Sequence, residues 1–305
     1  MDNNLPAPAH FIVGLDGSRL AESVLPAVRD LAKALQARVT LVHVLETQPP
    51  ATVHGEPHLT SAAAAQTYLQ RVSQRLADEG VDVSTHVHDD PQRDVAAGIV
   101  LHAAELNADL IAICVHGRGG GLQDWLVGRT AQRVIALANR PVLVVPLHAK
   151  GDLGNYRHLL FPVDQYGDAQ AALPLARRLA EATRAEVFLV TVVPTAGTMP
   201  GDAGAASVFL PHTAESLLAF AEDEARAVLE RLAGELADAG TQVVVDVRRG
   251  DPARELLQAI IAFAADLVVM STHARTGLDG FWAGSVGPRV VGSAPCPLLL
   301  VPIRE

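Results

Sequence analysis

The fold is decided by a stretch that the chain contains twice: LPAVRDLAKALQARVTLVHV at residues 25–44 and LPLARRLAEATRAEVFLVTV at residues 173–192. The two copies align without a gap at a shift of 148 residues, and Asp16 falls on Asp164 at the same shift. In each copy, apolar residues at helical spacing come first, and a short run rich in Val and Leu follows. A helix followed by a buried strand, written twice, indicates two copies of one α/β domain.

Landmarks further along the chain pair at other shifts, so insertions separate them. The paired positions are Pro91 with Pro252, Asp109 with Asp266, His116 with His273, Gly128 with Gly284 and Pro141 with Pro297. The segment from Pro91 to Asp109 is four residues longer than its counterpart, which predicts an extra helical turn in the first copy. We therefore expect one domain over residues 1–148 and a second over residues 156–305, joined by a glycine-containing linker.

Strand-like runs and helical patterns alternate through both copies. The expected strands are residues 11–15, 39–44, 81–87, 108–115 and 141–146 in the first copy, and 159–163, 186–193, 242–247, 266–271 and 297–301 in the second. Continuous runs of Val, Ile and Leu between helices are typical of parallel strands that helices cover on both faces. With right-handed crossovers, we expect an α/β fold of two tandem, doubly wound, parallel five-stranded sheets, each in the order 3-2-1-4-5.

The composition excludes several classes of protein. The 305 residues include 24 Lys and Arg against 34 Asp and Glu, a formal net charge of -10, so we expect no nucleic-acid partner. No apolar run reaches the ~20 residues of a membrane helix, and residues 1–10 lack the features of a secretory signal. Cys114 and Cys296 are too few for a disulfide framework, so we expect a cytoplasmic protein.

Candidate ligand-binding residues follow strands 1 and 4 of each copy, where the winding of a doubly wound sheet reverses. They are Gly14, Leu15, Asp16, Gly117, Arg118, Gly128 and Thr130 in the first copy, and Pro162, Val163, Asp164, Ser271, His273, Ala274, Arg275, Gly284, Ser285 and Val286 in the second. Free amides at a helix start favour a phosphate, and a carboxylate after strand 1 can accept hydrogen bonds from a ribose or an adenine amino group. This constellation predicts a nucleotide site.

The loop after strand 4 resembles the pattern G-x-x-G-x9-G-[ST] of the universal stress proteins. The second copy reads STHARTGLDGFWAGS at residues 271–285, with Ser271 and Ala274 at the two leading glycines and nine residues between Ala274 and Gly284. The first copy keeps Gly117 and Gly128, with ten residues between them, and has Arg129 where Ser or Thr is usual. The resemblance covers nearly the whole chain, twice.

The resemblance implies a Rossmann-like fold of the adenine nucleotide alpha hydrolase type, and binding of ATP, with ADP and AMP left open. It implies that Asp16 and Asp164 face the ribose and adenine, and that backbone atoms of Val44 and Val192 meet the adenine. It also implies a binding module that acts as a stress-response sensor and is not an enzyme. The last strands of the two copies are expected to pair within one chain, and two such chains could associate again.

Two other functions stay open at this point. One is a ligand-free interaction protein, favoured by the departures from the motif at Ser271, Ala274, Cys114 and Arg129. The other is a slow ATPase, although no lysine lies in either phosphate loop, and efficient phosphoryl transfer needs positioned cations. Asp16 and Asp164 also have a structural alternative, since either could cap the helix that follows.

Histidines form one further pattern. His86 and His88 lie on one face of an expected strand, and such a pair can bind zinc or nickel. The second copy has Asp246 and Arg248 in this place, so we prefer a solvated strand end and assign no metal site. His43 lies within an apolar strand and is interpreted as a core histidine.

Overall fold

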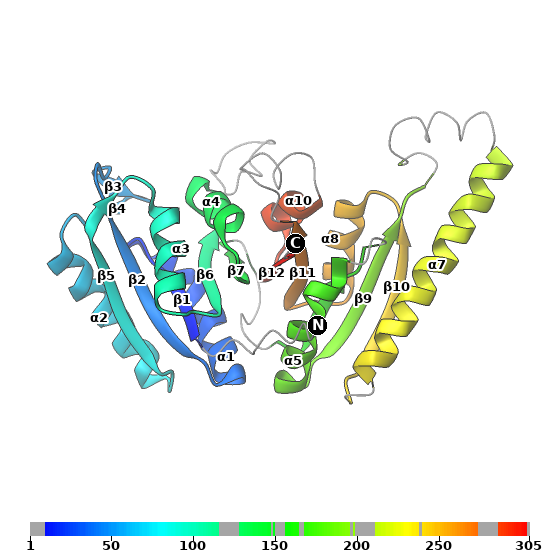
Figure 1. Cartoon of the computed structure of the whole chain (residues 1–305), viewed down its shortest axis with the longest axis horizontal. Coiled ribbons are helices and arrows are strands. Elements are labelled where there is room, and N and C mark those ends of the chain that lie inside the picture. The colour runs from blue at the N-terminus through cyan, green and yellow to red at the C-terminus, as the bar shows by residue number, and fades with distance from the viewer. Residues whose placement is uncertain are drawn as a thin grey trace.

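The chain forms one sheet with helices on both faces (Figure 1). The computed structural model describes residues 10–115, 128–147, 149, 156–164, 168–195, 198, 211–237, 240–273 and 286–303. In this described part, no helix combines the length and the apolar character that a bilayer-spanning segment needs.

The first half holds five parallel strands. They are β1 (His10–Gly14), β2 (Arg38–Glu46), β5 (Val83–Gln92), β6 (Leu110–Val115) and β7 (Val142–Pro146). Their hydrogen-bonded order is β5-β2-β1-β6-β7, which is 3-2-1-4-5 when these five strands are numbered along the chain. The helical elements between them are η1 (Ala21–Val24), α1 (Leu25–Leu35), α2 (Ala62–Asp78), α3 (Val95–Glu105) and α4 (Arg129–Leu137). A short hairpin of β3 (Thr52–Val53) and β4 (Glu56–Pro57) follows β2.

The second half repeats this arrangement. Its strands are β8 (His158–Pro162), β9 (Glu186–Val193), β10 (Val243–Arg249), β11 (Leu267–His273) and β12 (Leu298–Ile303), in the order β10-β9-β8-β11-β12. Its helical elements are η2 (Asp168–Ala171), α5 (Leu173–Thr183), α7 (Pro211–Ala237), α8 (Pro252–Ala262) and α10 (Val286–Ser293).

The two five-stranded sheets join edge to edge at the centre of the molecule (Figure 1). Strand β7 pairs antiparallel with β12, and Leu143 lies opposite Leu299. This is the pairing of last strands that the sequence predicts, and it merges the two expected sheets into one ten-stranded sheet. Each β7 or β12 edge alone would present unpaired N–H and C=O groups between apolar side chains, so the pairing satisfies both edges.

Two hydrophobic cores cover the two faces of the sheet, and each core runs through both halves. Helices α1, α2, α5 and α7 pack on one face, and α3, α4, α8 and α10 pack on the other. In β1, Phe11 and Val13 belong to the first core and Ile12 to the second, and all three are fully buried. Burial of both faces explains why the strands are uninterrupted apolar runs.

The extra helical turn predicted in the first half is wrong. Helices α3 and α8 both have 11 residues, and each has an aspartate N-cap, Asp94 or Asp251, whose carboxylate accepts a hydrogen bond from a first-turn amide. The additional residues lengthen β5 to 10 residues against 7 in β10, and the β2–β5 register shifts between Val44 and Glu46. Pro91 lies within β5 whereas Pro252 begins α8, so the caps, and not these prolines, are the equivalent positions.

Candidate functional site

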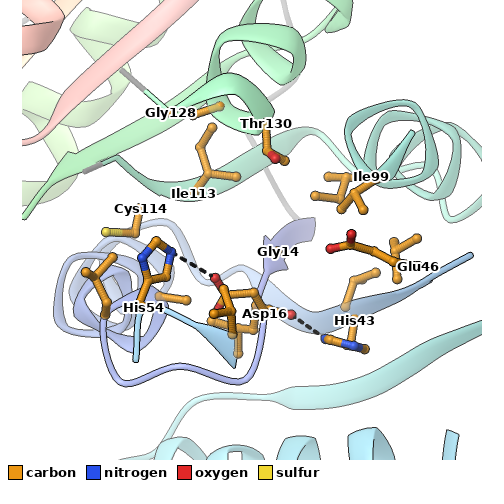
Figure 2. A pocket seen from close by; sticks show the side chains of 18 of the residues that line it. Gly14, Asp16, His43, Glu46, His54, Ile99, Ile113, Cys114, Gly128 and Thr130 are labelled. Carbon is orange, nitrogen blue, oxygen red and sulfur yellow. Dashed lines mark hydrogen bonds and ion pairs between the residues drawn. The ribbon is translucent and has the colours of Figure 1, made fainter. Parts of the chain in front are cut away.

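A cavity of about 290 Å³ lies at the carboxyl ends of β1 and β6, where the winding of the first half reverses (Figure 2). Its lining includes the predicted residues Gly14, Leu15, Asp16, Val44, Gly128 and Thr130. Gly117 and Arg118 lie outside the described residues. The fold therefore brings strand ends and a helix start, far apart in sequence, around one space.

The Asp16 carboxylate is held beside this cavity by the turn that follows β1. Its Oδ1 accepts hydrogen bonds from the Ser18 amide at 2.9 Å and the Ser18 hydroxyl at 2.6 Å. The Ser18 hydroxyl in turn accepts from the Ala21 amide at 3.1 Å, so Ser18, and not Asp16, caps the helical segment. The other oxygen, Oδ2, lies 3.4 Å from His54 Nε2 (Figure 2). Asp16 is thus oriented by its own turn, and its side chain stays about one-third exposed.

The start of α4 forms the opposite side of the cavity. Helix α4 begins at Arg129, and its N-cap, Gly128, provides no side-chain acceptor for the first-turn amides. These amides and the positive end of the helix dipole favour an anion. Arg129 and Thr130 also line the cavity, so a cation and a hydroxyl stand at the same place.

The wall between these two ends is apolar. Val42 and Val44 of β2, Ile99 of α3 and Ile113 of β6 line it. Gly14 lies against this wall, because a Cβ at this position would come within 3.0 Å of Ile99 Cδ1. The middle of the cavity therefore suits an apolar group.

Polar residues that were not among the sequence-based candidates enter the cavity from β2 and the hairpin after it. They are Glu46, His54 and His58, and all three line the cavity. His58 Nε2 lies 3.2 Å from Glu46 Oε1. A signal was present, since strand 2 neighbours strand 1 in the order 3-2-1-4-5 and ends at the same edge of the sheet.

His43 is buried, as its interpretation as a core histidine requires. Its Nδ1 donates a hydrogen bond to the Leu15 carbonyl at 2.8 Å, and burial lowers the pKa of the imidazole. Its Nε2 is buried and finds no hydrogen-bond partner among the described residues. His43 also borders the cavity and holds the turn that carries Asp16.

Cys114, at the end of β6, borders the cavity as well. Its thiol lies 3.0 Å from the Ser23 hydroxyl, and burial raises the pKa of the thiol. The side chain is therefore a neutral thiol at neutral pH.

The described part of the second half repeats two contacts that lie beside this site. The Val163 amide donates to the Val190 carbonyl at 2.9 Å, as the Leu15 amide donates to Val42. The Thr191 hydroxyl donates to the Val163 carbonyl at 2.8 Å, in the place where His43 donates to Leu15. Val163, which follows β8, is thus held to β9 as Leu15 is held to β2.

The predicted residues of the second half fall on corresponding elements. Pro162 ends β8 and Asp164 follows it, Val192 lies in β9, Ser271 and His273 lie in β11, and Val286 begins α10. Ala274, Arg275, Gly284 and Ser285 lie outside the described residues. The Ser271 hydroxyl is buried and has no hydrogen-bond partner among the described residues.

The chain is a tandem, doubly wound α/β protein, and its cavity lies at the switch point, the place where ligands bind in folds of this class. The family model described as the universal stress protein family matches residues 9–146 and again residues 155–302. The chain therefore belongs to the universal stress protein family.

The chain resembles relatives that match it along nearly its whole length and relatives that match about half of it. Universal stress protein Rv1996 of Mycobacterium tuberculosis is 25% identical over 314 residues, which cover 97% of this chain and 95% of that protein. Universal stress protein MJ0531 of Methanocaldococcus jannaschii is 28% identical over 150 residues, which cover 48% of this chain and 82% of that protein. The crystal structure of a universal stress protein from Archaeoglobus fulgidus superposes with a TM-score of 0.70 at 16% identity, covering 100% of this chain and 99% of that one, which shows a shared fold.

Proposed function

We propose that the chain binds an adenine mononucleotide, with ATP as the first candidate, in the cavity of its first half. We further propose that nucleotide binding makes the chain a regulatory module in the stress response. The observation that carries the proposal is the order of groups around one cavity. A carboxylate oriented by its turn lies at one end, an apolar wall in the middle, and an uncapped helix start at the other end.

These groups suggest one orientation for the nucleotide. Two carboxylates, Asp16 and Glu46, lie on the β1–β2 side of the cavity and would repel phosphates. The start of α4, with Arg129, would attract them. The phosphates are therefore expected at α4, with the ribose hydroxyls donating to Asp16 and the base against Val44.

The size of the cavity supports a small ligand. A volume of about 290 Å³ is near the lower end of the range for small-molecule pockets, roughly 300–1,000 Å³. A single nucleotide fits this scale better than a dinucleotide, and its phosphates can extend toward the solvent.

A second site is proposed in the other half. The residues we assign to it are Pro162, Val163, Asp164, Val192, Ser271, His273, Ala274, Arg275, Gly284, Ser285 and Val286. Support comes from Val163, whose amide and carbonyl bond to β9 as those of Leu15 bond to β2.

We propose binding without efficient catalysis. Both carboxylates of the cavity already have partners, since Asp16 accepts from Ser18 and Glu46 faces His58. Among the described residues that line the cavity, Arg129 is the single Lys or Arg. Phosphoryl transfer needs several positioned cations or a metal ion, so any hydrolysis of bound ATP is expected to be slow.

We also propose the cytoplasm as the location of this chain. Cys114 and Cys296 are both free thiols, and a reducing compartment keeps them so.

The experiment compares two matched variants, Asp16→Ala and Asp164→Ala. Purified protein is denatured, released nucleotide is identified by chromatography, and the affinities for ATP, ADP and AMP are measured by calorimetry on the nucleotide-free chain. We expect Asp16→Ala to remove the first-half site, and Asp164→Ala to leave that site intact. If no nucleotide is released, and added ATP neither binds nor raises the Tm, the proposal is wrong.

A further inference from the structure

Three histidines meet outside the cavity, on the face of the sheet that α3 covers. His86 and His88 lie in β5, next to Val42 and Val44 of β2, and His102 lies in α3. One ring nitrogen from each histidine lies within 4.8 Å of the other two. The strand spacing of two residues places the first two on one face, and packing of α3 on that face adds the third.

The contacts between the rings are close. His102 Nε2 lies 2.7 Å from His88 Nδ1, and the His86 and His102 ring centroids are 4.4 Å apart. His86 Nε2 is buried and has no hydrogen-bond partner among the described residues. A buried nitrogen with a free lone pair or proton is costly unless something binds it.

His102 is almost fully buried, and this burial, with the nearby His86 and His88, lowers its pKa. A neutral imidazole is the form that binds metals. Three imidazoles this close together suit a shared cation far better than three separate protons.

A carboxylate lies close to the other ring nitrogen of His102. Glu105 Oε2 lies 2.9 Å from His102 Nδ1, one helical turn along α3. Metal-binding histidines commonly direct their second nitrogen to a carboxylate, which fixes the ring and strengthens the ligand. This leaves His102 Nε2 facing His88, which is the nitrogen that a metal would use.

We propose that His86, His88 and His102 form a binding site for a divalent first-row transition metal ion of the Zn²⁺ class. Imidazole ligands suit Zn²⁺, Ni²⁺ or Cu²⁺, whereas Mg²⁺ and Ca²⁺ prefer oxygen. A tetrahedral zinc with Zn–N bonds of about 2.0–2.1 Å places its ligand nitrogens about 3.4 Å apart. Displacements of roughly an ångström would therefore bring the three ring nitrogens to these positions. Three protein ligands leave the fourth position to water.

The second half has other residues at the three positions that correspond to these histidines. At the positions of His86 and His88 it has Asp246 and Arg248, which form an ion pair at 2.6 Å. At the position of His102 it has Ala259, at the 157-residue shift that also aligns the Asp94 and Asp251 caps. The proposal therefore requires one metal ion per chain and not two.

A metal here would connect the edge strand β5 to the well-packed helix α3. Strand β5 is the last strand of the sheet and has one neighbour, β2, whereas α3 is packed into the core. Binding the folded chain in preference to the unfolded chain raises its stability. This proposal stands independently of the nucleotide site, because none of the three histidines lines that cavity.

The test uses the chain without a histidine tag, freed of metal by a chelator. Zn²⁺ is titrated by calorimetry, and Co²⁺ is added to record the visible absorption of a tetrahedral nitrogen site. We expect one strong site per chain and a higher Tm with Zn²⁺. His86→Gln and His88→Gln should each weaken binding by more than ~100-fold, and Glu105→Gln by ~10–100-fold. His158→Gln, in the second half, is the matched control and should bind as the parent chain does.

Two results would overturn the proposal. One is a parent chain that binds Zn²⁺ no more tightly than the variant lacking all three histidines. The other is full binding in either His86→Gln or His88→Gln. These two side chains are only partly buried, so both variants are expected to fold, as circular dichroism can verify, even where His102→Gln does not.

Discussion

The hydroxyl of Tyr156 donates a 2.6 Å hydrogen bond to the carbonyl oxygen of Ala27 and so joins the beginning of the second half to α1 of the first. Tyr156 is 1% exposed and is one of the largest fully buried side chains of the described chain. The segment expected to be a linker therefore ends in a residue of the core. Together with the β7–β12 pairing, this contact makes the two halves one packed unit.

Replacing Tyr156 by Phe tests this connection. The ring still fills its site, but the hydrogen bond is lost, and we expect the free energy of unfolding to fall by about 0.5–1.5 kcal/mol. Denaturant unfolding measures the change. A single transition should remain, and unchanged stability would show that the bond adds nothing to the packing of the ring.

Gly14→Ala tests the close approach of β1 to α3. The new Cβ would lie 3.0 Å from Ile99 Cδ1, so the side chain of Ile99 must move into the cavity or β1 must shift. Overpacking of this kind costs about 1–3 kcal/mol. Calorimetry with ATP should show weaker binding, and thermal unfolding a lower Tm.

Ile99→Val supplies the control for this change, because it removes the Cδ1 atom that the new Cβ would meet. The double variant Gly14→Ala, Ile99→Val should recover most of the lost affinity and Tm. If the double variant is no better than Gly14→Ala alone, the crowding at Ile99 is not the cause.

Stability should fall as the pH is lowered from about 7 toward 5. Burial lowers the pKa values of His10 and His43 below the ordinary 6.5. Below pH 6.5 the unfolded chain takes up protons that the folded chain does not, so each histidine lowers the free energy of unfolding by up to about 1.4 kcal/mol per pH unit. Well above pH 6.5 both the folded and the unfolded chain hold these histidines neutral, and the pH dependence vanishes.

Denaturant unfolding at a series of pH values measures this slope. His10→Gln should reduce it, because the titrating group is removed while the hydrogen bond of His10 Nδ1 to the Leu106 carbonyl can be replaced by an amide. A slope that is equally steep in His10→Gln would assign the effect to other groups.

The N-cap of α8 predicts a difference between two substitutions of Asp251. Its carboxylate accepts from the Arg254 amide at 2.9 Å and pairs with both terminal nitrogens of Arg289 at 2.8 Å. Asp251→Ala removes cap and charge, and we expect a loss of about 1 kcal/mol. Asp251→Asn keeps the cap, so it should lose less.

The same pair gives a second, acidic pH dependence. The Arg289 guanidinium lowers the pKa of Asp251 below its ordinary 3.8, so the stabilisation is present above that value and is lost as the pH falls further. Unfolding at low pH should show this loss in the parent chain and not in Asp251→Asn. Equal curves for the two chains would contradict the ion pair.

Much of the fold could be predicted because it is written in local patterns that occur twice. Apolar runs such as residues 39–44 predict strands that are buried on both faces, and β2 is such a strand. The extra helical turn was predicted wrongly because a proline was aligned where a helix cap was the equivalent residue. Pro91 and Pro252 share a residue type, but only Asp251 and Asp94 share a position in the fold.

The candidate site could be predicted only where strand ends follow from topology. Asp16, which follows β1, and Thr130, at the start of α4, line the same cavity because a doubly wound sheet brings those ends together. Glu46 was missed because the apolar run that predicted the strand ends at residue 44, two residues before it. His54 was missed because the hairpin after β2 carries no periodic pattern.

The sequence by itself determined the repeat, the strands and helices, and the edge of the sheet where a ligand can bind, because periodicity and residue type act locally. Only the tertiary structure decided that His102 joins His86 and His88, and that Tyr156 reaches Ala27. Spacing within β5 places two histidines on one face, but which helix covers that face, and which of its side chains points there, depends on how the whole core packs.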